Sequence, residues 1–162
     1  MISWNDAEKN ITEEVEFLKN NLSPSPFEQN DPIKCEYCLL RKIAIFIVSG
    51  KIKLKKISYK NNSIWQSENY RRDDNLKKHG GNWHNDLIIT IEKYFLANGM
   101  KVEKEPALYY GRADLKAGDN LFIEVGTINS YKLYLNLSSL KNCKIILVPS
   151  DNYLLEFNLW EK

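Results

Sequence analysis

The chain has 162 residues, of which 43% are hydrophobic and 27% are charged, and its formal net charge is only +2. This composition excludes general disorder. No apolar run approaches the roughly 18 residues that span a bilayer, so no membrane partner is expected. The polar N-terminus around Asp6 and Glu8 is unlike a secretory signal, and three cysteines are too few for a disulfide scaffold. We therefore expect an intracellular, cytoplasmic protein of one domain, or of one domain with an appendage.

Residues 1–82 are predicted to form a helix followed by a basic β-hairpin. Apolar residues recur at helical spacing over residues 3–22, and two prolines follow this segment. An apolar, β-branched run over residues 42–48 and an alternating run over residues 51–58 flank a Ser-Gly pair that can form a tight turn, which predicts a hairpin. One face of its second strand is cationic and carries Lys51, Lys53 and Lys55.

Residues 83–162 show the pattern of a separate α/β core. The predicted elements are a helix over 83–98, strands over 101–108, 111–116 and 121–127, a helix over 131–141, and strands over 144–149 and 153–160. Helices that separate strands in this order predict a mixed β-sheet flanked by helices. A glycine pair at positions 80 and 81 marks the break between the N-terminal appendage and this core.

Two carboxylates stand on neighbouring predicted strands. Alternation places Asp114 and Glu124 each on one face of its strand, in otherwise apolar surroundings. Because burying a lone carboxylate is costly, two that converge would need a cation, and oxygen ligands suit Mg²⁺ or Mn²⁺. Alternatively, each carboxylate faces solvent or pairs with Arg112 or Lys116, and the pattern alone leaves both interpretations open.

The order of these elements resembles the core of the PD-(D/E)XK nuclease superfamily over about residues 83–149. That family has the order α-β-β-β-α-β, with an Asp on its second strand and a Glu-x-Lys motif on its third. Arg112-Ala113-Asp114-Leu115 is similar to the Asp strand, and Phe122-Ile123-Glu124-Val125-Gly126 is similar to the Glu strand. The resemblance implies a restriction-endonuclease-like αβββαβ fold in which Asp114 and Glu124 hold Mg²⁺ or Mn²⁺ and take part in catalysis.

The sequence departs from this family at Gly126, which stands where the family has the lysine of Glu-x-Lys. That lysine stabilises charge on the phosphate, so another residue would have to supply the cation. Lys116 shares the predicted face of Asp114, and Lys132 begins the next helix, so either could reach the site. Each could equally be an ordinary solvated lysine.

The family also has an acidic residue in its first helix, and Glu92 is the candidate by residue type. His84 begins the same helix, as a histidine does in several nuclease-like relatives. The two residues lie about two turns apart along the helix, so they need not serve one site. Either could instead be a surface residue.

The sequence also contains one C-x-x-C pair, formed by Cys35 and Cys38. One pair does not complete a four-ligand zinc site, and the distance to His79 is too long for a zinc finger, so we do not expect zinc there. A thioredoxin-like redox role is not expected either, because the pair precedes a predicted hairpin rather than opening a helix.

Two functions follow from these expectations. The first is a metal-dependent nuclease acting on phosphodiester bonds of DNA or RNA, with DNA preferred as the partner and a homodimer suited to paired cuts on a duplex. The second is a nuclease-fold protein that binds nucleic acid without catalysis, as the departure at Gly126 allows. Expected contacts to backbone phosphates are Lys51, Lys53, Lys55, Arg71 and Arg72. Aromatic residues that could stack on unpaired bases, or simply pack in the core, are Tyr59, Trp65 and Tyr70.

Overall fold

The computed structural model describes residues 3–23, 35–60, 63–65 and 83–160. The elements are α1 (Trp4–Asn21), α2 (Glu36–Val48), β1 (Lys53–Ser58), the 3₁₀ helix η1 (Ser63–Trp65), α3 (Trp83–Ala97), β2 (Val102–Lys104), β3 (Leu115–Ala117), β4 (Leu121–Val125), α4 (Ser130–Ser139), β5 (Lys144–Val148) and β6 (Tyr153–Asn158). The order from α3 to β5 is α-β-β-β-α-β, as predicted.

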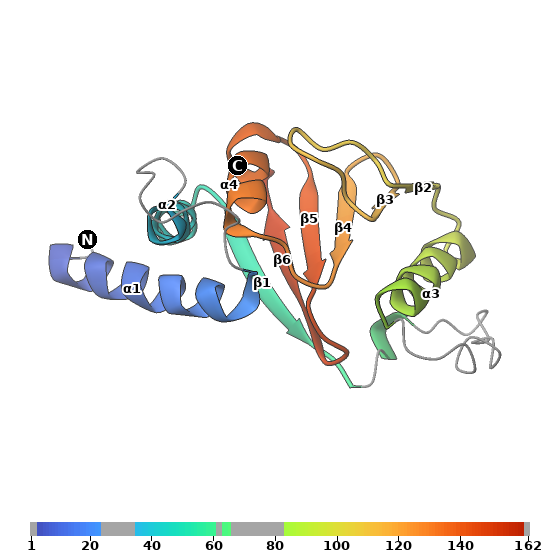
Figure 1. Cartoon of the computed structure of the whole chain (residues 1–162), viewed down its shortest axis with the longest axis horizontal. Helices are drawn as coiled ribbons and strands as arrows, with labels where there is room; N and C mark the ends of the chain where they lie inside the picture. Colours follow the sequence, from blue (N-terminus) through green and yellow to red (C-terminus); the bar gives the residue numbers. More distant parts are fainter. Residues whose placement is uncertain (1–2, 24–34, 61–62, 66–82, 161–162) are drawn as a thin grey trace.

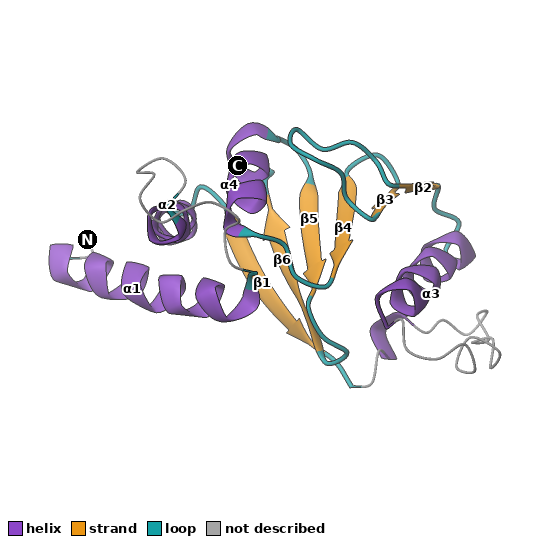
Figure 2. Cartoon of the chain, in the orientation of Figure 1, coloured by secondary structure: helices purple, strands orange, loops and turns teal. Residues whose placement is uncertain are grey.

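The strands form one mixed sheet with the order β1-β6-β5-β4-β3-β2. β4 and β5 are parallel and are joined by α4, as a parallel connection requires a crossover. The other neighbouring pairs are antiparallel. Figure 2 shows this sheet with helices on both sides, so the predicted α/β class is confirmed.

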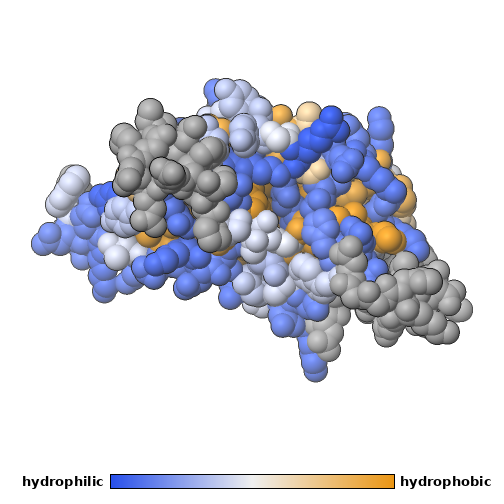
Figure 3. All heavy atoms as spheres, in the orientation of Figure 1, coloured by the Kyte–Doolittle hydropathy of each residue, from blue (hydrophilic) through white to orange (hydrophobic). Residues whose placement is uncertain are grey.

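Each face of the sheet carries its own hydrophobic core. α1, α2 and α4 pack on one face, against side chains such as Phe122 and Phe157. α3 and η1 pack on the other, against Leu115, Ile123 and Val125. In Figure 1, α1, α2 and α4 accordingly lie on one side of the strands, and α3 lies on the other. The face seen in Figure 3 is largely hydrophilic, with hydrophobic residues visible between polar ones.

The predicted helix at the N-terminus is confirmed. Ser3 caps α1 by accepting a hydrogen bond from the backbone N–H of Asp6 at 3.2 Å, so the helix begins where a capping residue allows it. A bidentate pair then links α1 to α2, because both Nη atoms of Arg41 donate to the carboxylate of Glu8, at 2.7 and 3.2 Å.

The prediction of a β-hairpin over residues 42–58 is wrong. Residues 42–48 belong to the helix α2, and β1 pairs with β6 instead of with that segment. Leu39, Leu40, Ile43 and Ala44 are buried at helical spacing, and the helix packs between α1 and α4. A short apolar run has the same appearance in a buried helix and in a buried strand, which explains the error. β1, which belongs to the segment predicted as an N-terminal appendage, is therefore an edge strand of the same sheet as the strands of residues 83–162.

The first two strands of the core are shorter than predicted. β2 ends at Lys104 because Glu105 has a φ of 49°, a left-handed conformation that breaks a strand. The chain continues as a long hairpin, in which Ala107 bridges Arg112 before β3 begins at Leu115. The tip of this hairpin comprises residues 108–111 and is closed by a hydrogen bond from the N–H of Leu108 to the carbonyl of Gly111, at 3.0 Å.

Candidate active site

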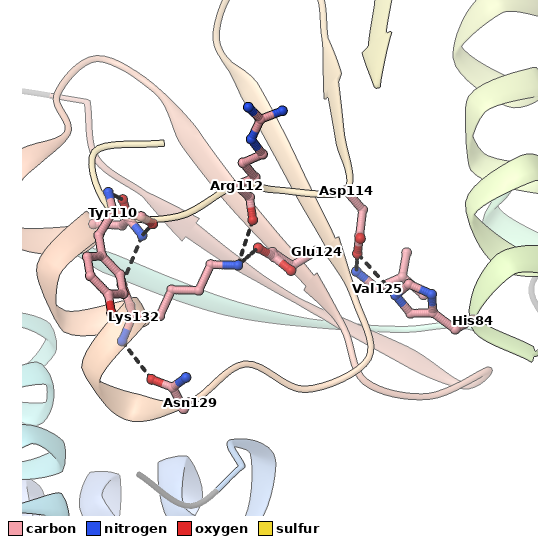
Figure 4. A network of polar contacts seen from close by, with 9 residues as sticks. His84, Tyr110, Arg112, Asp114, Glu124, Val125, Asn129 and Lys132 are labelled. Carbon is pink, nitrogen blue, oxygen red and sulfur yellow. Dashed lines mark hydrogen bonds and ion pairs between the residues drawn. The ribbon is translucent and has the colours of Figure 1, made fainter. Parts of the chain in front are cut away.

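Four of the predicted site residues come together at the carboxyl end of β4 (Figure 4). They are His84, Asp114, Glu124 and Lys132. The first turns of α3 and α4 supply His84 and Lys132, and these reach the end of the strand from opposite sides. In sheets with parallel strands, ligands bind beyond the carboxyl ends, where the connecting segments leave room for them.

Glu124 is the buried acid of this site, with only 8% of its surface exposed. Its Oε1 accepts a hydrogen bond from Nζ of Lys132 at 2.5 Å. Burial raises the pKa of Glu124, the ammonium of Lys132 opposes this shift, and the charge of Asp114 adds to it. The ionised form of Glu124 is thus disfavoured by its surroundings, and further positive charge would stabilise it.

Lys132 is held in place by several groups. Asn129 caps α4 and accepts a hydrogen bond from the backbone N–H of Lys132 at 2.8 Å. Besides Glu124, Nζ donates to the carbonyl oxygen of Arg112 at 2.6 Å. The stem passes over Gly111, where a Cβ atom would lie 3.3 Å from Cε of Lys132. Because Gly111 has no side chain, the path by which the ammonium of Lys132 reaches Glu124 stays open.

Asp114 directly precedes β3, which neighbours β4, and its N–H donates to the carbonyl of Ile123 at 3.1 Å. Its Oδ2 accepts a hydrogen bond from the backbone N–H of Val125 at 2.7 Å and lies 3.4 Å from Nε2 of His84. Asp114 thus fixes the end of β4 and also contacts α3.

The predicted alternation around Asp114 is not followed throughout. Ala113 packs into the core under α4, whereas Leu115 packs into the core under α3. Strict alternation would point these two residues to the same side, but the chain changes its facing at Asp114, where the irregular hairpin passes into β3.

The backbone at Gly126 has a conformation that favours glycine. Its φ is +92°, a conformation that side-chain-bearing residues rarely adopt, and its N–H donates to the carbonyl of Val148 at 2.8 Å. A Cβ atom here would lie 3.8 Å from the ring of His84. A lysine at this position would strain the backbone, and the ammonium comes from Lys132 on α4 instead.

Two other candidates make different contacts. Nζ of Lys116 lies 5.4 Å from the centroid of the Phe122 ring, as in a cation–π contact. Glu92 pairs with Lys104 on β2, with 3.4 Å between Oε2 and Nζ. The structure thus favours Lys132 over Lys116 as the cation beside Glu124, and it places Glu92 in an ion pair between α3 and β2.

The hairpin tip and its anchor are features that the sequence analysis missed. Asn136 of α4 is 1% exposed, and its side chain forms hydrogen bonds with both backbone groups of Tyr110, at 3.0 and 2.9 Å. Its Nδ2 also donates to the carbonyl of Lys132 at 2.9 Å. A polar residue on the apolar face of the predicted helix, one turn after Lys132, was the signal for this anchor.

Two of the basic residues predicted to bind phosphates, Lys53 and Lys55, lie on the other face of the sheet from Glu124. The register places Lys53 and Lys55 on the face of the sheet that α3 covers, whereas Glu124 shares its face with Phe122 on the side of α4. Lys51 precedes β1, and its Nζ lies 4.4 Å from the ring centroid of Phe46. Arg71 and Arg72 lie outside the described residues.

Two of the aromatic residues considered for base stacking, Trp65 and Tyr59, make contacts within the fold. Trp65 is buried at 3% exposure against Tyr94 and Phe95. The hydroxyl of Tyr59 donates to the carbonyl of Ser150 at 3.1 Å. Tyr70 lies outside the described residues.

Cys35 and Cys38 open α2, whereas the sequence was expected to form a hairpin after them. Cys35 is the N-cap residue, and a hydrogen bond from the backbone N–H of Cys38 is the main cause that lowers the pKa of its thiol. Burial raises the pKa of Cys143. A redox role was not expected because a hairpin was predicted after the pair, and that prediction is wrong. Cys35 and Cys38 are free thiols.

The acids of the site suit a divalent cation by their chemistry. Glu124 contacts the ammonium of Lys132, Asp114 lies beside His84, and burial raises the pKa of Glu124. Carboxylate oxygens are the ligands that Mg²⁺ and Mn²⁺ prefer. Within the described residues, no group of three or more His, Cys, Asp and Glu side chains is arranged to hold a metal ion. Asp114 and Glu124 are two carboxylates close enough to influence each other, and they do not by themselves form such a group.

No protein-family model, curated protein or solved structure matches this chain. The resemblance to the PD-(D/E)XK superfamily therefore stays a prediction that rests on the residues. Among the helices that the structure describes, none has the length and apolar character needed to cross a bilayer.

Proposed function

We propose that the protein is a divalent-cation-dependent nuclease that hydrolyses phosphodiester bonds, with DNA preferred over RNA. The proposal rests on one observation: Lys132 brings its ammonium to the buried carboxylate of Glu124, beside Asp114. Two acids and one cation at the carboxyl end of a strand are the groups that phosphodiester hydrolysis with a metal ion requires.

The residues of the site have separate roles in this proposal. Asp114 and Glu124 would hold Mg²⁺ or Mn²⁺, which supplies an activated water and neutralises charge on the scissile phosphate. Lys132 can donate a hydrogen bond to a phosphate oxygen and stabilise the charge that develops as the P–O bond breaks. Its contacts with Glu124 and the Arg112 carbonyl fix the ammonium in advance, so little reorganisation is needed. His84 can hold or release a proton at Nε2, next to Asp114.

The basic lysines around β1 remain proposed contacts for backbone phosphates. Lys53 and Lys55 are exposed on an edge strand, three strands from β4, which corresponds to about 14 Å. A nucleic acid that reached both them and the site would have to pass around the sheet, because they occupy opposite faces. Any homodimer stays a prediction from the resemblance.

The test is a cleavage assay with Mg²⁺ or Mn²⁺ on single-stranded and duplex forms of DNA and RNA. Asp114→Ala should abolish cleavage, and Lys132→Met should slow it by roughly a hundredfold, the usual effect of removing one donor to a developing negative charge. Lys104→Met is the matched control, because Lys104 pairs with Glu92 and not with the site acids. Cleavage that persists unchanged in Asp114→Ala would refute the assignment.

The second candidate is a nucleic-acid-binding protein without catalysis. One observation favours it: Oδ2 of Asp114 already accepts a hydrogen bond from the Val125 N–H and contacts His84, as a purely structural acid would. In that case the wild type binds nucleic acid but cleaves none of the substrates, and calorimetry detects no Mg²⁺ or Mn²⁺ binding at millimolar concentration.

A further inference from the structure

The hairpin tip beside the site presents two tyrosines to solvent. Tyr109 is 66% exposed and Tyr110 is 42% exposed. The Tyr110 ring packs edge-on against Tyr131 of α4, with 5.3 Å between the ring centroids. Single exposed aromatic residues are common on protein surfaces, so exposure alone carries no inference.

The tip is held rigidly, which a merely solvated loop does not require. The buried side chain of Asn136 binds the N–H and the carbonyl of Tyr110, and the tip closes on itself between Leu108 and Gly111. Because the backbone is fixed, the rings would lose little conformational freedom on contact with a ligand.

The same anchor connects the tip to the candidate site. Nδ2 of Asn136 donates to the carbonyls of both Tyr110 and Lys132. On the other side of the tip, the carbonyl of Arg112 accepts a hydrogen bond from the Lys132 ammonium, and the lysine stem crosses Gly111. The backbone of the tip is thus tied both to α4 and to the Lys132 ammonium. We call the exposed residues at and beside the tip, Tyr109, Tyr110 and Arg112, the tyrosine shelf.

We infer that the tyrosine shelf binds the unpaired bases of a single-stranded nucleic acid next to the phosphate that lies at Lys132. This inference rests on the proposed function, since it names the form of substrate for that site. Aromatic side chains stack on base faces, and Arg and Lys attract the phosphates between the bases. In a duplex the base faces are covered by neighbouring bases, so only an unpaired strand offers them to Tyr109.

The experiment measures binding by fluorescence anisotropy, using a labelled oligonucleotide single-stranded and as a duplex of the same sequence. The protein carries Asp114→Asn, which blocks cleavage while retaining a hydrogen-bond acceptor for Val125. Tyr109→Ala should weaken single-strand binding by about five- to a hundredfold and leave duplex binding within twofold. Tyr109→Phe retains the ring and should bind as the parent does. Tyr37→Ala is the matched control, because Tyr37 is 60% exposed but lies on α2.

The outcomes separate this inference from the proposed activity. If the wild type cleaves nucleic acid but Tyr109→Ala binds single strands as the parent does, the shelf is refuted and the nuclease activity stands. Equal affinity of the parent for the single strand and the duplex also refutes the shelf. If the wild type cleaves nothing but single-strand binding depends on the Tyr109 ring, the shelf is supported and the catalytic assignment fails.

Discussion

At the scale of single residues, the position of Lys132 depends on a glycine that it crosses. Gly111 has a φ of +74°, and a Cβ atom there would crowd Cε of Lys132 at 3.3 Å. We predict that Gly111→Ala costs about 1–2 kcal/mol of stability through backbone strain and also displaces the ammonium. Cleavage should then fall by up to roughly a hundredfold, as misplacement of a catalytic group does.

Gly99→Ala separates these two effects. Gly99 has nearly the same conformation, with a φ of +76°, but no atom lies within 4 Å of its Cβ position. The Gly99→Ala variant should therefore lose about as much free energy of unfolding as Gly111→Ala, measured by chemical denaturation, and should keep full cleavage activity. Equal activity in both variants would show that Gly111 does not position Lys132.

The proximity of Asp114 and Glu124 could be predicted from the sequence, but the lysine that contacts Glu124 could not. A short turn is a local property, so it brings the two segments beside each other as predicted, although the alternation expected around Asp114 is not followed. Whether Lys116 or Lys132 meets Glu124 depends on how α4 packs against the hairpin, which no local pattern specifies. Tyr109 and Tyr110 were missed for the same reason, because their importance comes only from their distant anchor on α4.

At the scale of elements, Asn136 joins α4 to the long hairpin between β2 and β3. Two of its hydrogen bonds hold the backbone of Tyr110 at the hairpin tip, and a third binds the Lys132 carbonyl within α4. We predict that Asn136→Ala lowers the free energy of unfolding by about 2 kcal/mol, because water can form hydrogen bonds with only some of the backbone groups that lose the Asn136 amide. Amide hydrogen exchange at Tyr110 should become faster in parallel.

The control for this prediction is Asn98→Ala. Asn98 also donates from its side chain to a backbone carbonyl, that of Tyr94 at 2.7 Å, but it is exposed. Its replacement should change stability by no more than about 0.5 kcal/mol. If both variants unfold at the same denaturant concentration, Asn136 does not anchor the tip.

Among the elements, α2 shows where sequence patterns stop being informative. The segment from Lys42 to Val48 has the composition of a strand, and its helical conformation follows from contacts on both sides with α1 and α4. The nine other predicted helices and strands were found at nearly their predicted positions, apart from the shortened β2 and β3. β2 ends before Glu105, which is in a left-handed conformation that its residue type does not predict, and β3 begins only at Leu115.

At the scale of the whole molecule, cation binding should depend on pH through Glu124. Burial raises the pKa of this carboxyl above its usual value of 4.5, so the native state binds a proton more readily than the unfolded chain. Without metal, Glu124 therefore makes stability fall as the pH rises from 4.5 through the raised pKa. A cation that binds the ionised carboxylates opposes this loss and competes with the proton.

We predict that Mn²⁺ raises the melting temperature more at pH 8 than at pH 5, measured by calorimetry at a fixed millimolar concentration. Asp114→Asn should lose most of this increase at pH 8 while it retains the fold. The same increase at both pH values, or in the variant, would mean that Mn²⁺ binds elsewhere.

The place of β6 in the sheet has a consequence for how the chain folds. β6 is formed by residues 153–158 and lies between β5 and β1. β5 is close to it in sequence, whereas the residues of β1 pair with it across about a hundred positions. β1 consequently has no partner strand until residues 153–158 have been synthesised. Closing so long a loop is entropically costly and slow, and β1 and the helices around it expose apolar surface during that interval. The pairing of β1 therefore waits for β6, and a ribosome that pauses before residue 153 would hold a chain prone to aggregation.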